Sequence, residues 1–184
     1  MSHLLNFEEI YEQNKRMVYN LALSYLQNHE DAQEVAQDVF VTVYQSVKNF
    51  NHQSRISTWI YRIAINKSLD FIRFKNRKKR FAFFSCIFYE SGEVKYESIG
   101  FNHPGVELEN KEALENIFAH INRLPEKQKT ALILSKIEKL PQTEIAEIMN
   151  LSAKAVESLL GRAKENLLKK LNAQRRIINR MNVE

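Results

Sequence analysis

The apolar residues of this 184-residue chain recur at helical spacing along most of its length. Residues 6–26 carry them at intervals of three and four, and residues 29–47 continue with a second stripe of the same period. The stripe of residues 6–26 consists of Phe7, Ile10, Tyr11, Val18, Leu21, Ala22 and Tyr25. Asn28 lies between the two segments as a candidate helix N-cap, and Asp31 follows it in the manner of a capping box. The pattern therefore predicts two helices joined by a short turn.

The side of residues 29–47 that lies opposite the apolar stripe carries Glu34, Asp38, Val41 and Gln45. An exposed valine among acidic and amide side chains is unremarkable on a solvated helix. The same combination is also typical of a surface that docks another protein. The sequence leaves both interpretations open.

A break in the periodicity over residues 48–57 predicts a loop, which leads into a strongly basic helix within residues 54–80. Two sides of this helix are apolar and are expected to be buried. The third side collects an aromatic residue, arginines and an amide at helical spacing. These residues are Trp59, Arg62, Asn66, Asp70, Arg73 and Arg77.

The charge of the chain is concentrated in blocks. Residues 55–80 hold nine Lys and Arg residues against the single acid Asp70, although the net charge of the whole chain is only +5. Because cations neutralise phosphates and an aromatic ring can stack on an unpaired base, the third side of the basic helix fits a nucleic-acid-binding surface. A solvated face with Trp59 in the core is the alternative. A second basic block covers residues 123–184, which indicates a second contact with a polyanion.

No helical period holds from Phe81 to about Gly105, a stretch that contains three of the four glycines. We therefore predict a linker over residues 81–105. The run FAFFSCIFYE is rich in aromatic residues for a linker, which suggests a contact with the first domain or with a partner. Helical periodicity resumes in residues 106–184 and predicts a second domain. Within it, one helix is expected over residues 126–140, with Pro125 at its start.

Residues 142–171 have the spacing of a helix-turn-helix, with a generic helical hairpin as the alternative. Ala146 is small where two helices must approach, and Asn150 tolerates the left-handed conformation of a tight turn. Ser152 is a candidate cap for the second helix. The buried stripe of this helix is expected to comprise Val156, Leu160, Ala163, Leu167 and Leu171. In this motif the second helix enters the major groove, so its outward residues are candidates for DNA contact: Lys154, Glu157, Ser158, Gly161 and Arg162.

The composition favours an all-α fold, because the chain has only four glycines and three prolines. We predict two small helical domains, residues 1–80 and 106–184, joined by the linker. The single cysteine, Cys86, excludes an internal disulfide and a cysteine-based zinc site. No apolar run approaches the ~20 residues of a membrane helix, and the acidic N-terminal stretch differs from a signal peptide. We therefore expect a cytoplasmic protein without membrane insertion.

Three stretches together resemble a bacterial RNA polymerase sigma factor of the extracytoplasmic-function (ECF) type, within the sigma-70 family. DAQEVAQDVFVTVYQSV is similar to the core-polymerase-binding helix of region two. STWIYRIAINKSLDFIR is similar to the helix that melts and reads the minus-ten promoter element. LPEKQKTALILSKIEKLPQTEIAEIMNLSAKAVESLLGRAKENL is similar to region four, which reads the minus-thirty-five element.

The resemblance implies a non-enzymatic initiation factor that needs no cofactor. Its implied partners are core RNA polymerase, double-stranded and melted promoter DNA, and an anti-sigma protein. Polymerase docking would fall to Glu34, Gln37, Asp38 and Val41. Contacts with minus-ten DNA would fall to Asn51, Ser54, Arg55, Trp59, Arg62, Asn66, Arg73 and Arg77. Contacts with minus-thirty-five DNA would fall to the outward residues of the helix-turn-helix, Lys154, Glu157, Ser158, Gly161 and Arg162.

The chain departs from the family pattern in the helix-turn-helix. Glu157 and Leu159 replace residues that are basic in many members, which predicts weaker phosphate attraction or a different base preference. Two other functional classes also stay open. A stand-alone helix-turn-helix regulator explains residues 141–171 but not the basic helix, and an RNA-binding or partner-binding module would use both basic stretches electrostatically. Co-purification with core RNA polymerase separates the sigma factor from both.

Overall fold

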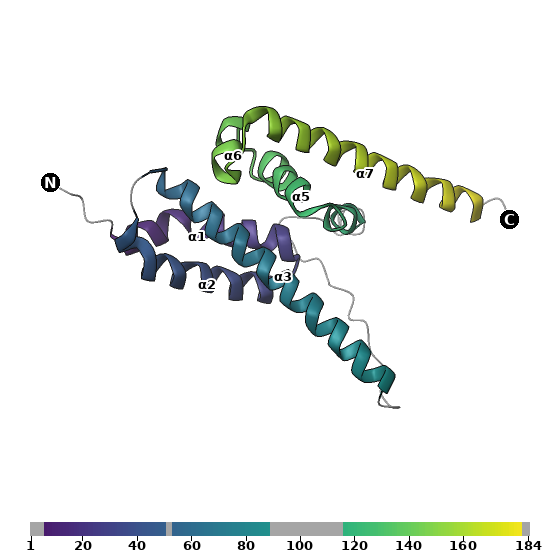
Figure 1. The fold of residues 1–184 in the computed structure, drawn as a ribbon, viewed down its shortest axis with the longest axis horizontal. Helices are drawn as coiled ribbons and strands as arrows, with labels where there is room; N and C mark the ends of the chain where they lie inside the picture. Colours follow the sequence, from purple (N-terminus) through teal and green to yellow (C-terminus); the bar gives the residue numbers. More distant parts are fainter. Residues whose placement is uncertain (1–5, 51–52, 89–115, 182–184) are drawn as a thin grey trace. The chain divides into compact units, whose positions relative to one another are not determined.

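A computed structural model describes residues 6–50, 53–88 and 116–181, and it places side chains in these ranges except at 79–88 and 173–181. The chain divides into two compact units, Met1–Asn102 and His103–Glu184. Within the described ranges all regular structure is helical (Figure 1). The all-α fold class with two helical units is therefore confirmed.

The first unit contains α1 (Phe7–Leu26), α2 (His29–Ser46), the short 3₁₀ helix η1 (Val47–Asn49) and α3 (Ile56–Phe88). The predicted cap between the first two helices is present, because the Asn28 side chain accepts a hydrogen bond from the Asp31 backbone N–H at 2.9 Å. Gln27 precedes it with a φ of 56°, the left-handed conformation that ends α1 and turns the chain into α2.

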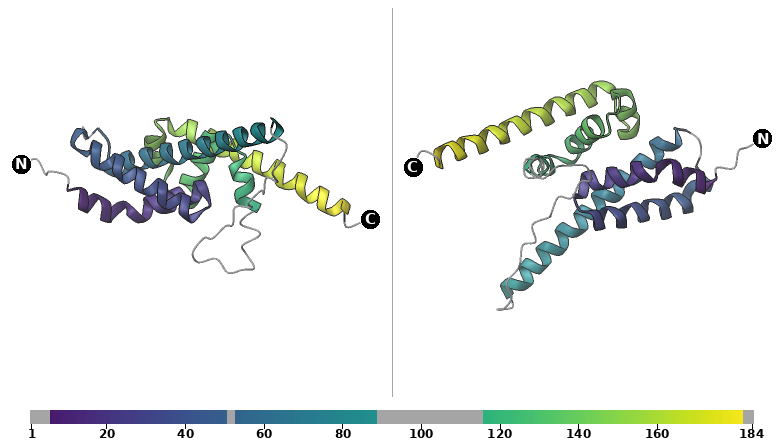
Figure 2. Two further views of the ribbon diagram at one scale, coloured as in Figure 1. Left: turned by 90° about the horizontal axis from the view of Figure 1, so that it is seen from below. Right: turned by 180° about the vertical axis from the view of Figure 1, so that it is seen from behind.

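The core of the first unit lies where α3 packs against both α1 and α2 (Figure 2). The predicted apolar stripes supply most of it, and the residues with the least exposure are Val18, Leu21, Ala22, Tyr25, Ala32, Val35, Val39, Val43, Ile60 and Ala64. Tyr11 is the exception among the predicted positions of α1, because its ring is exposed. It lies in the first half of α1, against Phe40 at the second half of α2.

The helix α3 is longer than the sequence suggested. It continues to Phe88, whereas the first domain was expected to end near Arg80. No glycine or proline occurs between Ile56 and Phe88, so nothing in the backbone chemistry stops the helix earlier. In Figures 1 and 2 its C-terminal part extends beyond the ends of α1 and α2. The rest of the expected linker, residues 89–105, lies outside the described residues.

The second unit contains a helical segment at residues 116–122, then α5 (Glu126–Leu132), the π-helical segment η2 (Ile133–Ile137), α6 (Gln142–Met149) and α7 (Ala153–Met181). One continuous helix was expected through residues 126–140. Instead, the end of this segment has backbone hydrogen bonds that span five or six residues, where an α-helix has bonds that span four. One of them runs from the Leu140 N–H to the Leu134 carbonyl at 3.0 Å. Lys139 then takes a φ of 56°, which ends the helix two residues before Pro141.

The core of the second unit is built from the helical segment at residues 116–122, α5, η2, α6 and the first half of α7. Its buried apolar residues are Phe118, Ile121, Leu124, Ala131, Ile133, Leu134, Ile145, Ala146, Ile148, Val156 and Ala163. The stripe predicted for α7 included Leu171, and this part of the prediction is wrong because Leu171 is exposed. Figure 1 shows that α7 extends well beyond α5 and α6. At the adjacent Lys170 the contact with the rest of the unit is polar, because its ammonium group donates a hydrogen bond to the Arg123 carbonyl at 3.1 Å.

Side-chain hydrogen bonds connect α5 with α7 and with the helical segment at residues 116–122. Asn166 donates a hydrogen bond to the Gln128 side chain at 2.9 Å. Lys129 of α5 is buried and donates from Nζ to Asn122 Oδ1 at 2.5 Å. Burial lowers the pKa of Lys129 from 10.5 to about 8, and the neighbouring Glu126 partly opposes that shift. The hydrogen bond to Asn122 offsets part of the desolvation of the ammonium group.

Candidate docking surface and nucleic-acid interface

The outer side of α2 is free of the core and exposes the residues that the sequence assigned to protein docking. Glu34, Gln37, Asp38 and Val41 are all exposed, and 53% of Val41 is accessible. An apolar side chain surrounded by acids and amides is thus available to a partner. We call these four residues the α2 surface.

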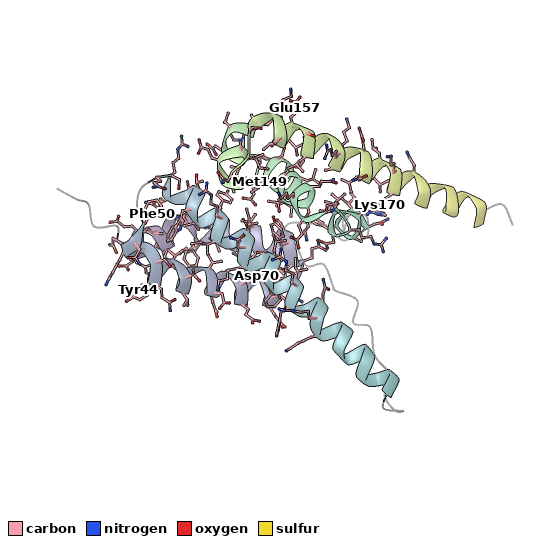
Figure 3. All side chains as sticks on the ribbon, in the orientation of Figure 1. Tyr44, Phe50, Asp70, Met149, Glu157 and Lys170 are labelled. Atoms are coloured by element: carbon pink, nitrogen blue, oxygen red, sulfur yellow. The ribbon has the colours of Figure 1, made fainter. Side chains whose placement is uncertain are left out.

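An aromatic cluster borders the α2 surface, and the sequence reasoning missed it. Tyr44 is 64% exposed one turn after Val41 (Figure 3). The Phe7 ring meets it edge-on, with ring centroids 5.1 Å apart. The spacing of three residues from Val41 would have identified Tyr44 as part of the same side. Its neighbour in space, Phe7, belongs to another helix, so the local pattern of α2 contains no signal for the pair.

The third side of α3 is polar and accessible along most of its length. Asn66, Asp70, Arg73 and Arg77 are exposed, and Arg62 is half-buried. Asp70, marked in Figure 3, pairs with Arg73 at 3.0 Å. Asp70 is the one acid on this side of α3, and Arg73 neutralises it. Arg62 and Arg77 therefore leave this side with a net positive charge.

Trp59 is neither fully exposed on the third side of α3 nor fully buried in the core. It is half-buried, and its ring lies against Phe50 with centroids 5.2 Å apart and planes inclined by 42°. Phe50 comes from the segment before α3 and therefore supports one part of the indole while another part stays accessible. Nearby, Arg55 is exposed and Ser54 is half-buried. Asn51, also assigned to minus-ten DNA, lies outside the described residues.

Two ion pairs connect α2 with α3. Lys75 contacts Asp31 near the start of α2. Lys67 lies 4.0 Å from Asp38, which belongs to the α2 surface. Sequence periodicity could not reveal either pair, because each joins residues far apart in the chain. Of these four residues only Asp38 belongs to the α2 surface, and Lys67 directly follows Asn66 of the third side of α3.

The helix-turn-helix geometry is confirmed in α6 and α7. Asn150 has φ 52° and ψ 51°, the left-handed turn predicted for it. The Leu151 N–H donates to the Ala146 carbonyl at 2.9 Å, and Ser152 Oγ accepts from the Ala155 N–H at 3.2 Å. This hydrogen bond caps α7 at the residue that the sequence indicated.

The outward residues of α7 are accessible as a group. They are Lys154, Glu157, Ser158, Gly161 and Arg162, and all of them are exposed. Glu157 is marked in Figure 3 near the start of α7. A Cβ atom on Gly161 would meet nothing within 4 Å, so no other part of the described structure covers the backbone at this position.

The described ranges contain no group of three or more His, Cys, Asp or Glu residues that could hold a metal ion. None of the helices placed there combines the length and apolar character that crossing a bilayer requires.

Two family models match this chain. The model described as Sigma-70 region 2 matches residues 10–78, which contain most of α1 and all of α2. The model described as Sigma-70, region 4 matches residues 114–167, which contain α5, α6 and the first half of α7. The matches thus fall on the two units separately.

Known proteins are similar over most of the chain. RNA polymerase sigma factor SigV of Bacillus subtilis is 30% identical over 150 residues, covering 82% of this chain and 81% of SigV. The ECF RNA polymerase sigma factor SigW of the same organism is 29% identical over 167 residues, covering 90% and 88%. The sigma factor RpoE of Bartonella quintana, solved with the anti-sigma factor NepR, has a TM-score of 0.62 at 20% identity, covering 90% of this chain and 96% of RpoE. The RpoE chain therefore shares the fold.

Proposed function

This chain belongs to the sigma-70 family of RNA polymerase sigma factors, within its ECF type, and from this premise we propose which residues carry each step of initiation. A sigma factor binds core RNA polymerase, directs it to promoters and assists promoter melting. It is not an enzyme, because the nucleotide chemistry belongs to the polymerase. One observation supports this function over a stand-alone regulator: a helix-turn-helix occurs in the same chain as a separate basic helix with an aromatic residue on its open side.

Reconstitution tests the function directly. The purified chain should co-migrate with core RNA polymerase on size exclusion, and the complex should start transcripts at discrete genomic positions that core enzyme alone ignores. A chain that binds duplex DNA specifically but never joins core polymerase would instead be a stand-alone regulator.

Polymerase docking is assigned to the α2 surface. Val41 supplies exposed apolar area, and Glu34 and Asp38 supply negative charge for a basic partner surface. Tyr44 extends the same side with an exposed ring, a side chain that is frequent at the centre of protein interfaces. The proposed partner is the clamp-helix region of the large polymerase subunit.

Asp38→Arg should weaken binding to core polymerase by at least ~10-fold, since a like charge would face a basic partner surface. The fold should persist, because Asp38 is exposed and its pair with Lys67 contributes at most ~1 kcal/mol. Competition binding to core polymerase, with circular dichroism of the free variant, measures both effects. Glu30→Arg is the matched control, since it reverses the same charge on α2 outside the α2 surface. If the two variants bind core equally well, the docking assignment to Asp38 is wrong.

Minus-ten DNA is assigned to α3 as far as Arg77 and to the segment before this helix. Trp59, supported by Phe50, offers a face for an unpaired base, and Arg55, Arg62, Arg73 and Arg77 offer cations for the strand. Asn66 and Ser54 offer hydrogen bonds, and Asn51 completes the proposed set. The arrangement suits single-stranded capture, in which stacking and phosphate contacts combine.

Minus-thirty-five DNA is assigned to the exposed residues at the start of α7. Lys154 and Arg162 would contact phosphate or guanine, Ser158 either base or backbone, and Glu157 could accept from cytosine N4. Gly161 allows close approach of the backbone. Since Glu157 is acidic, we propose that base preference here differs from family members with a basic residue at this place.

Ser158→Ala and Arg162→Ala should each reduce promoter-specific binding by ~1–3 kcal/mol if the side chain contacts a base. Each side chain is exposed, so the stability of the second unit should change little. Holoenzyme binding to duplex promoter and to non-specific duplex, across a salt series, measures the effect. An equal loss on both duplexes with a shallower salt slope would indicate a phosphate contact instead. No loss from either variant would contradict the proposed orientation of the helix-turn-helix.

An anti-sigma protein is the proposed regulatory partner, since the similar RpoE chain was solved bound to one. We further propose that the functional domains are residues 1–80 and 106–184, joined by residues 81–105, with the helical part of that connection reaching Phe88. The proposed place of action is the bacterial cytoplasm, because polymerase and promoter DNA are both there.

A further inference from the structure

The two ion pairs between α2 and α3 differ in how firmly they are held. Asp31 and Lys75 are in direct contact, and only 16% of the Asp31 side chain is exposed. Asp38 and Lys67 are 4.0 Å apart, with 64% and 37% of their side chains exposed. The first pair is partly shielded from water and fixes the start of α2 against α3. The second is surrounded by solvent, so a competing charge can open it easily.

The looser pair also joins the two proposed surfaces of the first unit. Asp38 belongs to the α2 surface, and Lys67 directly follows Asn66 of the proposed minus-ten side. A residue that is one position along a helix lies 100° around it, so Lys67 borders the DNA side rather than facing it. Its flexible four-carbon stem lets the ammonium group reach toward either neighbour.

We propose that Lys67 is a further contact between this protein and the DNA backbone, and that Asp38 holds it back until polymerase engages Asp38. The proposal rests on the assignment of the α2 surface to polymerase and of α3 to DNA. A carboxylate that turns to a cation of polymerase leaves the Lys67 ammonium without its partner. That ammonium is then available to a phosphate, which gives α3 one more unpaired positive charge in the holoenzyme than in the free chain.

Thermodynamic linkage requires that polymerase binding and DNA binding strengthen each other to the same degree. If polymerase binding releases Lys67 for DNA, then DNA binding must favour polymerase binding by the same factor. Because the pair is exposed, the factor is small, about two- to fivefold at low salt. It should fade when salt screens the pair. The arrangement would favour promoter DNA for the holoenzyme over the free sigma factor.

The first test uses the free full-length protein and a labelled single-stranded DNA of mixed sequence. Asp38→Asn should raise affinity for this DNA about two- to fivefold at low salt, because it frees Lys67. Glu34→Gln is the matched control, since Glu34 lies one turn away on the same side of α2 and forms no ion pair with the described residues. A gain of equal size in both variants would reflect only the loss of a negative charge and would overturn the proposal.

The second test repeats the comparison in a Lys67→Gln background. The difference between Asp38→Asn and Glu34→Gln should vanish, because no ammonium group remains to be released. If the advantage of Asp38→Asn persists without Lys67, Asp38 does not act through Lys67 and the proposal is wrong. Circular dichroism should match the wild-type protein throughout, since all three side chains are partly or largely exposed.

The third test uses the holoenzyme with the Lys67→Gln substitution alone. Loss of one phosphate contact should lower the slope of log affinity against log salt by ~1. An unchanged slope would show that Lys67 does not reach DNA, and would overturn the proposal. Assembly of the wild-type holoenzyme and its promoter-specific transcription test the proposed function independently, so a failure there is distinguishable from a failure of Lys67.

Discussion

Trp59→Ala should impair promoter opening, with a loss of ~1–3 kcal/mol in open-complex stability, because it removes a stacking platform for an unpaired base. Duplex binding before melting should be little changed, since a closed duplex offers no splayed base. Permanganate footprinting of the bubble, on a promoter that the wild-type holoenzyme transcribes, reports the opening step. Filter binding at a temperature too low for melting reports the closed complex.

The half-buried position of Trp59 sets the control for this experiment. Truncation also removes its contact with Phe50, so some loss of stability is expected, but less than the ~3–5 kcal/mol of a fully buried aromatic residue. Phe50→Leu disturbs the same contact while leaving the indole in place. If Trp59→Ala opens promoters like the wild-type protein once its folded fraction is accounted for, the nucleic-acid role of Trp59 is wrong. If Phe50→Leu impairs opening equally, support of the ring matters as much as the ring.

Leu134→Ala should destabilise the second unit by ~3–5 kcal/mol, because Leu134 is fully buried and its truncation leaves a cavity. The loss equals a large part of the stability of a small domain. The first unit has its own core and should unfold as before, so hydrogen exchange should report the loss only within residues 116–181. Binding to core polymerase through α2 should survive, while promoter binding that depends on the minus-thirty-five element should fail.

Leu168→Ala is the matched control, because it makes the same chemical change in the same unit at a site that is 48% exposed. Its effect should stay within about 0.5 kcal/mol. Equal destabilisation by the two variants in urea titration would contradict the burial of Leu134 in the core of the second unit, where η2 packs against α6. Loss of polymerase binding in Leu134→Ala would contradict the separation of docking and duplex recognition between the units.

Several backbone features of this protein could be predicted from the local sequence. The cap at Asn28 and the left-handed turn at Asn150 were predictable because each depends on the conformational preference of one side chain and its near neighbours. The exposed residues at the start of α7 were predictable for a related reason, since helical period alone separates them from Val156 and Ala163. Three stretches in family order then identified the class of protein.

Some predictions from the sequence were wrong because the outcome depended on residues that are neighbours in space but not in sequence. Leu171 fits the apolar period of α7 but remains exposed, because the period alone does not tell which part of a long helix its neighbours cover. The segment before Pro141 shows the same limit, because η2 widens and Lys139 turns left-handed to position α6, which no local propensity requires. The aromatic run after Arg80 hid the continuation of α3, although that stretch contains no residue that breaks a helix.

The sequence by itself determined the helical fold, the helix-turn-helix and the outward sides of α2 and α3, because period and capping are properties of adjacent residues. Only the tertiary structure decided how those sides meet. Phe50 supports one part of Trp59, Phe7 adds its ring to Tyr44, and Asp38 lies beside Lys67. Each of these contacts joins separate segments of the chain, and such pairs form only when packing of the apolar stripes brings the segments together.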